Sequence, residues 1–357
     1  MQTLMQALAA NPGSGPDLTD DGAPFIIAEM SGNHNQSLDR ALAIVDAAAA
    51  TGAHALKIQT FTPGSMTLDL DAGEFSIRDP KSLWAGRRLY DLYAEAMTPA
   101  DWHQPIFDRA RAKGILCFST PFSEDAVDLL ESLNAPAYKI ASFEAVDLPL
   151  IRYVASTGKP MIISTGMATV AEIAEAVEAA TGAGCTNLTL LKCTSSYPAS
   201  PENTNLLTMP VIGATFGCNV GLSDHTLGIG VAVAAVALGA SVIEKHFIID
   251  RSEGGVDSAF SLEPDEFTAL VSETRRAAQA LGHVHFGGTA SEMAGRKKRR
   301  SLYIGTDMAA GEVLTPANLR RIRPGLGLAP KHFEALLGRK VARAVPKGTP
   351  MAWDLLE

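Results

Sequence analysis

The chain has 357 residues, a formal net charge of −9 and an apolar fraction of 46%. This length can bury a large core, and the composition is typical of a folded globular protein rather than a disordered one. The acidic balance gives no reason to expect binding to nucleic acid or to an anionic membrane. The only basic run, RKKRR at 296–300, is short and is interpreted first as part of a linker.

Cysteine usage and the first residues favour a cytoplasmic location. Cys117, Cys185, Cys193 and Cys218 form no CxxC pair, and three of them lie in apolar segments, which predicts reduced thiols in the core. Residues 1–22 have no basic n-region and no long apolar stretch, so we expect a loose extension rather than an export signal. No window reaches the roughly 18 consecutive apolar residues of a transmembrane helix.

Short apolar segments recur along the chain, each followed by a turn and an alanine-rich helical segment. The predicted strands are 25–30, 55–60, 116–121, 137–142, 161–166, 188–193, 220–225 and 242–247. Eight strands alternating with helices over roughly 250 residues predict an α/β fold, a closed (β/α)8 TIM barrel at 23–283. The alternative, an open doubly wound sheet, usually has fewer strands and a glycine-rich first turn, whereas the first turn here reads SGNHNQ.

Two further regions depart from this repeat. Residues 61–101 are too many for a simple connection and include several aromatic residues, so we expect them to shape a pocket at the C-terminal face of the barrel. After about residue 283 the pattern changes to a linker at 284–299 and a tail at 300–357. The tail is rich in Gly and Pro with short apolar runs, which is typical of a small, irregular β domain.

Every predicted strand ends in polar residues, and in a barrel these ends converge on one mouth. Lys57 and Lys139 stand inside otherwise apolar strands. Each could extend out of the barrel or pair with an acid, as a structural lysine does. Together with Thr120, Ser142 and Ser164, however, they predict a cationic pocket lined with hydroxyl donors, which suits a phosphate or a carboxylate.

His225 and His246 end the last two strands, which are neighbours in a closed ring. Imidazole is a favoured ligand of first-row divalent metals, so the pair predicts a metal site with open positions for water or substrate. Glu29, Glu144 and Asp257 lie nearby and could be extra ligands, proton carriers or hydrogen-bond acceptors for a polyol. Their spacing does not separate these roles.

A set of motifs connects the chain to a known family. In order they are AEMSGNHNQSL, ALKIQT, FSTPF, YKIASFE, ISTGMA, LKCTSSYP, VGLSDHT, VIEKHF and IRPGLGLAP. From about Pro24 to the C-terminus the chain resembles the sialic acid synthase family, which condenses phosphoenolpyruvate with sugars to make nonulosonic acids. The tail resembles the antifreeze-like (SAF) domain of that family. SGNHNQSL and KCTSSYPA are similar to the pseudaminic branch, and Ser195 and Ser196 stand where the sialic acid branch typically has an asparagine and a bulkier residue.

The resemblance implies a role for each matching residue. Phosphoenolpyruvate would be held by Lys57, Thr120, Lys139, Ser142, Ser164 and Ser223. The sugar would be faced by Asn33, Tyr197, Asp257 and Arg323. His225 and His246 would hold a divalent ion, usually manganese, magnesium or cobalt, and Glu144 and then Glu29 are the candidates for moving protons. The resemblance also implies a domain-swapped homodimer in which Arg323 reaches into the barrel of the partner.

In the pseudaminic branch the sugar is 2,4-diacetamido-2,4,6-trideoxy-L-altrose, and the products are pseudaminic acid and phosphate. An alternative is an N-acetylneuraminic or legionaminic acid synthase, using N-acetylmannosamine or the diacetamido trideoxy mannose analogue. Barrels that make heptulosonate or octulosonate phosphates share the chemistry but need a second phosphate site and normally lack the tail. A binding protein without activity is a further alternative, against which the intact set of charged strand ends argues.

Overall fold

The computed structural model describes residues 22–357, which form two compact units divided between Gly282 and His283. The predicted N-terminal extension lies, but for Gly22, outside the described residues. Among the helices of residues 22–357, none has the length and apolar character needed to cross a membrane.

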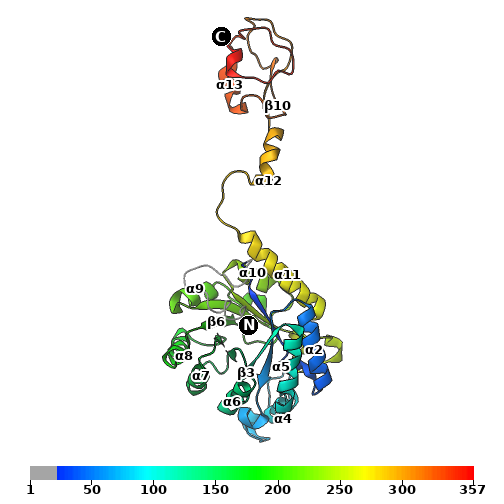
Figure 1. Ribbon diagram of the computed structural model, residues 1–357, viewed down its shortest axis with the longest axis vertical. Helices are drawn as coiled ribbons and strands as arrows, with labels where there is room; N and C mark the ends of the chain where they lie inside the picture. The colour runs from blue at the N-terminus through cyan, green and yellow to red at the C-terminus, as the bar shows by residue number, and fades with distance from the viewer. Residues whose placement is uncertain (1–21) are drawn as a thin grey trace. The chain divides into compact units, whose positions relative to one another are not determined.

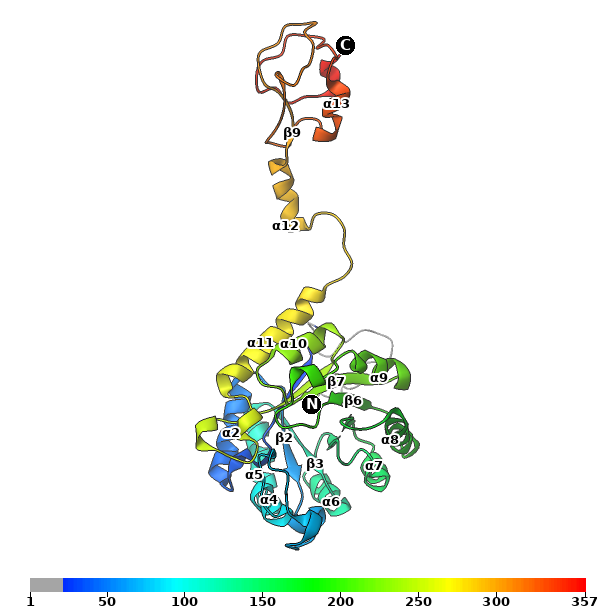
Figure 2. The same cartoon turned by 180° about the vertical axis from the view of Figure 1, so that it is seen from behind.

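The first unit is a closed barrel of eight parallel strands in sequence order (Figures 1 and 2). The strands are β1 (Phe25–Glu29), β2 (Ala55–Thr60), β3 (Leu116–Pro121), β4 (Tyr138–Ile140), β5 (Met161–Ser164), β6 (Leu188–Cys193), β7 (Asn219–Asp224) and β8 (Val242–His246). The last strand returns to the first, with Phe25 opposite Val242 and Glu29 opposite His246. This closure confirms the predicted TIM barrel and excludes the open sheet.

Helices surround the strands (Figure 1). They are α2 (Leu38–Ala50), α5 (His103–Lys113), α6 (Glu124–Ser132), α7 (Leu148–Ala155), α8 (Val170–Gly182), α9 (Thr208–Phe216), α10 (Gly230–Ala237) and α11 (Pro264–Leu281). Local sequence signals fix their ends. Thr169 and Glu172 form a capping box at the start of α8, and Gly114 ends α5 in the left-handed conformation.

The long connection at residues 61–101 contains structure of its own. It holds two short helices, α3 (Pro63–Met66) and α4 (Leu89–Ala96), and two 3-10 turns, η2 (Gly73–Phe75) and η3 (Ala100–Trp102). The indole nitrogen of Trp84 donates to the carbonyl oxygen of Val256 at 2.9 Å, in the segment that follows β8. The connection therefore packs against the C-terminal face of the barrel. The remaining 3-10 turns of this unit are η1 (Ser31–His34), η4 (Pro201–Asn203), η5 (Arg251–Glu253) and η6 (Ser258–Phe260).

Successive side chains of a strand point to opposite faces, so the apolar side chains of the barrel strands form two sets. One set packs beneath the helices as the main core. The other fills the interior of the barrel with Phe25, Ile27, Ala55, Phe118, Ala137, Ile162, Leu191 and Val242. Gly221 belongs to this crowded interior, because a Cβ there would lie 2.2 Å from the carbonyl oxygen of Val242. The next inward position on each strand faces the mouth.

The second unit is small and has its own apolar core. Strands β9 (Ser301–Ile304) and β10 (Leu319–Ile322) pair antiparallel, and the unit also contains α12 (Ala290–Met293), η7 (Ala294–Lys298), η8 (Pro330–His332), α13 (Phe333–Leu336) and η9 (Trp353–Leu355). Its core includes Leu302, Leu319 and Leu336. This agrees with the small β domain expected at 300–357. The expected linker carries short helical turns, because Thr289 and Glu292 form a capping box there.

Candidate active site

The barrel mouth is lined by polar residues that stand two positions after the interior apolar residues. Ile27 is followed in this way by Glu29, Ala55 by Lys57, and Val242 by Glu244 and then His246. The same spacing produces Thr120, Lys139, Ser164, Cys193 and Ser223 on the other strands. Alternate side chains of each strand point into the barrel. Along every strand these inward residues change from apolar to polar at the same height, next to the mouth, and all of these polar residues are buried.

A network of buried charges lies at the centre of the mouth. Lys139 Nζ contacts the two oxygens of the Glu244 carboxylate at 2.9 and 3.0 Å. Lys57 Nζ lies 2.5 Å from Glu29 Oε2 and 3.8 Å from Glu244 Oε1. Although burial alone would raise the pKa of the Glu244 carboxyl, Lys139 and Lys57 lower it well below its usual range. Glu244 therefore stays ionised and holds both ammonium groups in place.

Hydroxyl groups surround this network. Thr120 Oγ1 accepts a hydrogen bond from Lys57 Nζ at 3.0 Å, and Ser223 Oγ donates to Glu244 Oε1 at 3.3 Å. Ser142 Oγ accepts from the backbone nitrogen of Gly166 at 3.1 Å. The hydroxyl of Ser164 is buried and has no hydrogen-bond partner in the described structure. A buried donor without a partner costs free energy, so a ligand oxygen at this position would satisfy it.

Glu144 follows β4 at the rim. Burial raises the pKa of its carboxyl to about 7, and its Oε2 atom is buried without a hydrogen-bond partner in the described part of the chain. A carboxyl that changes its charge near neutral pH is suited to proton transfer. Glu29 is also buried, which raises its pKa despite the neighbouring Lys57, and its Oε1 accepts from Gln59 at 2.9 Å.

The two predicted metal ligands lie together, with ring centroids 5.3 Å apart. His225 Nδ1 is 3.0 Å from the carbonyl oxygen of Thr194. Since a carbonyl only accepts, Nδ1 carries the proton and Nε2 is left with a free lone pair. Burial lowers the pKa of His246 well below its usual value, and its Nδ1 has no hydrogen-bond partner among the described residues.

Burial alone would lower the pKa of His225, but the hydrogen bond with Cys193 raises it above its usual value. In their neutral forms the two imidazoles fit a divalent metal, because each then offers a nitrogen lone pair in the same mouth. Within residues 22–357 no group of three His, Cys, Asp or Glu side chains is arranged to hold a metal ion by itself. His225 and His246 would therefore be only part of a metal's ligand set. Asp257 Oδ2 lies 4.0 Å from His246 Nδ1 and also accepts a hydrogen bond from the hydroxyl of Ser31.

Aromatic rings form one wall beside the histidines. Tyr197, in the segment after β6, has its ring centroid 4.6 Å from that of His225 and 5.2 Å from that of Phe260. Trp84 of the long connection lies 6.0 Å from the Tyr197 ring. This wall brings together segments that follow β2, β6 and β8, which is consistent with the position predicted for Tyr197 at the mouth.

Asn33 and His34 of the opening AEMSGNHNQS segment are fully buried. Asn33 Nδ2 donates to the carbonyl oxygen of Phe247 and to Ser261 Oγ, both at 2.9 Å, so it ties the segment after β1 to the segment after β8. His34 Nδ1 accepts from the backbone nitrogen of Gln36, and its ring packs edge-on against Trp102. The structure gives His34 a packing role, whereas sugar binding by Asn33 remains a prediction.

Arg323 lies in the second unit, directly after β10, where it is exposed. The other predicted site residues all belong to the barrel unit. The role of Arg323 depends on the predicted partner subunit and remains a prediction.

Glu244 is the central residue that sequence reasoning left without a role. It stands among the polar strand ends, but the pattern does not distinguish it from its neighbour Lys245. Lys245 points to the opposite face and pairs with Asp224 at 2.7 Å, so both are structural. The alternation of side chains along a strand could have distinguished Glu244 from Lys245, because Glu244 lies two residues before His246 and therefore shares its inward face.

Comparisons with known proteins agree with this architecture. The NeuB family profile matches residues 44–286, and the SAF domain profile matches residues 299–357. The chain is 44% identical to pseudaminic acid synthase of Campylobacter jejuni, over 92% of this chain and 95% of that protein. It is 43% identical to pseudaminic acid synthase of Helicobacter pylori, over 94% of this chain and 98% of that protein.

A solved structure shares the fold as well as the sequence. The N-acetylneuraminic acid synthetase of Leptospira borgpetersenii, determined with citrate, superposes with a TM-score of 0.67 at 32% identity, covering 77% of this chain and 90% of that one. Family profile, relatives and fold thus agree over nearly the whole length. The chain therefore belongs to the NeuB family and carries a SAF domain at its C-terminal end.

Proposed function

We propose that this protein is a pseudaminic acid synthase, which condenses phosphoenolpyruvate with 2,4-diacetamido-2,4,6-trideoxy-L-altrose and water to give pseudaminic acid and phosphate. The observation that carries the proposal is the 43–44% identity to two pseudaminic acid synthases over more than nine-tenths of the chain. The charged and hydroxylated mouth supports it, because such a mouth suits a substrate that bears both a phosphate and a carboxylate.

Phosphoenolpyruvate would bind to the two lysines and to the hydroxyl groups around them. Lys57 and Lys139 supply the positive charge, and their carboxylate partners Glu29 and Glu244 keep them positioned before the substrate arrives. The unpartnered hydroxyl of Ser164 would donate to a substrate oxygen. Thr120, Ser142 and Ser223 complete the proposed set.

His225 and His246 would hold a divalent ion, manganese, magnesium or cobalt, whose Lewis acidity would stabilise negative charge on the sugar aldehyde oxygen. Metal dependence is part of the proposal. It is supported by the protonated Nδ1 of His225, which leaves Nε2 for a ligand bond, and by the unpartnered Nδ1 of His246.

The carbon–carbon bond would form when the methylene carbon of phosphoenolpyruvate attacks the aldehyde carbon. Glu144, protonated near neutral pH, would donate a proton to the former aldehyde oxygen, with Glu29 as the second candidate. Water then adds to C2 and gives up its proton, and the tetrahedral intermediate loses phosphate. No redox cofactor is needed, since the atoms balance among the two substrates and water.

The sugar would lie against Tyr197 and Asp257, with Asn33 beside them and Arg323 supplied by a partner subunit in a domain-swapped homodimer. The small hydroxyls of Ser195 and Ser196 favour an acylamino sugar with fewer hydroxyls over N-acetylmannosamine. We place the enzyme in the cytoplasm, which the free thiols of Cys117, Cys185, Cys193 and Cys218 support.

Phosphate release from phosphoenolpyruvate tests this proposal when each sugar is offered separately in the presence of manganese. We expect release with the trideoxy altrose sugar, little with N-acetylmannosamine or the legionaminic precursor, and none after chelation. Release with N-acetylmannosamine alone would keep the condensation chemistry but reject the pseudaminic branch. Unchanged release after chelation, or full activity of His246→Ala, would reject the metal site.

A further inference from the structure

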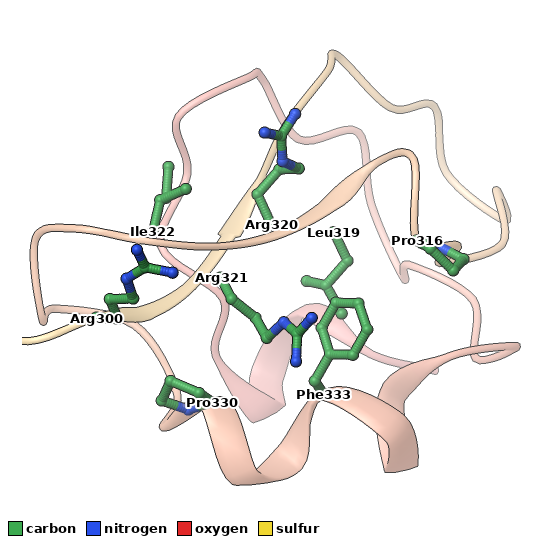
Figure 3. A pocket seen from close by; sticks show the side chains of 8 residues that line it. All are labelled: Arg300, Pro316, Leu319, Arg320, Arg321, Ile322, Pro330 and Phe333. Atoms are coloured by element: carbon green, nitrogen blue, oxygen red, sulfur yellow. The ribbon is translucent and has the colours of Figure 1, made fainter.

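The second unit contains a cleft that no proposed step uses. Its volume is about 610 Å³, and its walls are formed by Arg300, Pro316, Leu319, Arg320, Arg321, Ile322, Pro330 and Phe333. Figure 3 shows Arg300 and Arg321 on one side of the β10 ribbon and Arg320 on the other. This agrees with the alternation of side chains along a strand. The cleft therefore combines two guanidinium groups with apolar walls.

The guanidinium of Arg321 is held in a defined position. Its central carbon lies 4.6 Å from the centroid of the Phe333 ring, a cation–π contact, and Phe333 itself is buried in the core of the unit. Neither Arg300 nor Arg321 forms an ion pair with a carboxylate within residues 22–357, whereas Arg343 of the same unit pairs with Asp354. An ordered guanidinium without an anion is available to bind one.

The charge of the unit points the same way. Residues 283–357 contain 13 Lys and Arg against 6 Asp and Glu, whereas residues 1–282 contain 17 against 33. The positive potential that attracts anions is therefore concentrated in the smaller unit. An anionic ligand would find it there rather than over the outer surface of the barrel.

The walls of the cleft restrict which anion fits. Arg forks match a carboxylate with two parallel hydrogen bonds. Phe333 and the two prolines offer apolar surface next to that position, which a bare phosphate or the compact phosphoenolpyruvate would leave uncovered. The acetyl and methyl groups of an acylated deoxy sugar acid would cover it, and a cleft of this volume accommodates a sugar acid of nine carbons.

We propose that this cleft is a second binding site, separate from the barrel mouth, for an acylamino sugar acid of the kind the enzyme makes. The carboxylate binds Arg321 and Arg300, and the acetamido and deoxy groups pack against Phe333 and the prolines. The identity of the ligand rests on the proposed function, whereas the existence of an anion site rests on the cleft and its arginines alone. Such a site would let the accumulated product bind the SAF domain.

Isothermal titration of the full chain tests the site. Pseudaminic acid is titrated in the presence of a chelator and of saturating phosphoenolpyruvate, which occupies the barrel mouth. We expect one sugar acid per chain. Arg321→Gln should weaken its binding about tenfold or more, the value of a lost charged hydrogen bond, and Arg321→Lys less. Lys347→Gln removes one exposed charge from the same unit outside the cleft and should change binding less than about twofold.

Three results would overturn the inference: no binding under saturating phosphoenolpyruvate, equal binding by wild type and Arg321→Gln, or inorganic phosphate binding as tightly as the sugar acid. Turnover measured on the same preparation separates the two proposals. A chain that makes pseudaminic acid but does not bind it in this titration loses the second site only. A chain that binds it through Arg321 but does not make it keeps the site and loses the proposed function.

Discussion

Glu144 is the residue whose proposed role is most directly tied to pH. Its carboxyl is protonated below a pKa of about 7, so a proton donor is present at lower pH and is lost as the pH rises through that value. We expect kcat to fall across pH 7 in the wild type. Glu144→Gln should be slower by about 100-fold, as for a lost general acid, and should lack this fall.

The same shift predicts a change in stability. Between the ordinary carboxyl value of 4.5 and about 7, the folded chain keeps a proton on Glu144 that the unfolded chain releases. Its contribution to the free energy of unfolding is therefore complete below pH 4.5 and declines up to pH 7. Urea denaturation should show a shallower decline in Glu144→Gln. Identical profiles would mean that Glu144 is not buried as described.

Glu244 is expected to be essential for the structure of the mouth. Removing its charge leaves Lys57 and Lys139 buried without their shared partner, and breaking a buried ion pair costs about 3–5 kcal/mol. We predict that Glu244→Gln loses about 3 kcal/mol of unfolding free energy in urea titration. Asp108→Asn breaks an exposed pair with Arg111 and should change stability little. Equal losses in the two variants would contradict the network.

The positions of residues in the mouth were predictable where chemistry and strand position coincide. Lysines inside apolar strands and paired histidines at neighbouring strand ends are unusual enough to be recognised in one dimension, and both pairs lie in the mouth. The structural role of Glu244 was not predicted, because it arises from ion pairs with Lys57 on β2 and Lys139 on β4, which are distant in sequence. No role was predicted for His34, and its packing against Trp102 is a tertiary contact between segments distant in sequence.

At the scale of elements, Gly166 in the turn after β5 leaves room for two neighbouring serine side chains, because glycine has no side chain of its own. A Cβ at Gly166 would lie 2.2 Å from Ser195 Oγ and 2.7 Å from Ser142 Oγ. The first belongs to the segment that follows β6, and the second to the segment that follows β4. Glycine therefore allows three neighbouring segments to meet, and the proposed phosphoenolpyruvate contact of Ser142 depends on it.

We predict that Gly166→Ala folds but raises KM for phosphoenolpyruvate and lowers kcat/KM about 100-fold, since a displacement of about 1 Å can have that effect. Combining it with Ser195→Gly should recover part of the loss, because the closest clash is removed. Gly182→Ala, where the added Cβ meets no atom within 4 Å, is the matched control and should stay fully active. Normal activity of Gly166→Ala would reject this positioning role.

Most of the barrel strands could be predicted from the sequence. Strands β2, β3 and β6 have the predicted bounds, and β4 and β5 are shorter than predicted. The short helices of the 61–101 connection were not predicted. They are held by tertiary contacts such as that of Trp84 with Val256, rather than by a periodic apolar pattern.

At the scale of the whole molecule, the two units differ strongly in charge and would act together through Arg323. We expect Arg323→Ala to raise KM for the sugar about tenfold or more, the value of a lost charged hydrogen bond, with KM for phosphoenolpyruvate nearly unchanged. Arg343→Ala removes another exposed arginine of the same unit and is the control. Unchanged sugar kinetics in Arg323→Ala would reject the domain-swapped arrangement.

The central claim is that the barrel mouth joins phosphoenolpyruvate to a sugar through a new carbon–carbon bond. Phosphoenolpyruvate labelled with carbon-13 at its methylene carbon, incubated with the trideoxy altrose sugar and manganese, tests it by mass spectrometry and NMR of the product. We predict a nonulosonic acid that carries the label at C3, formed in equal amount to the phosphate. Labelled pyruvate and phosphate without label in the sugar would show hydrolysis and contradict the account.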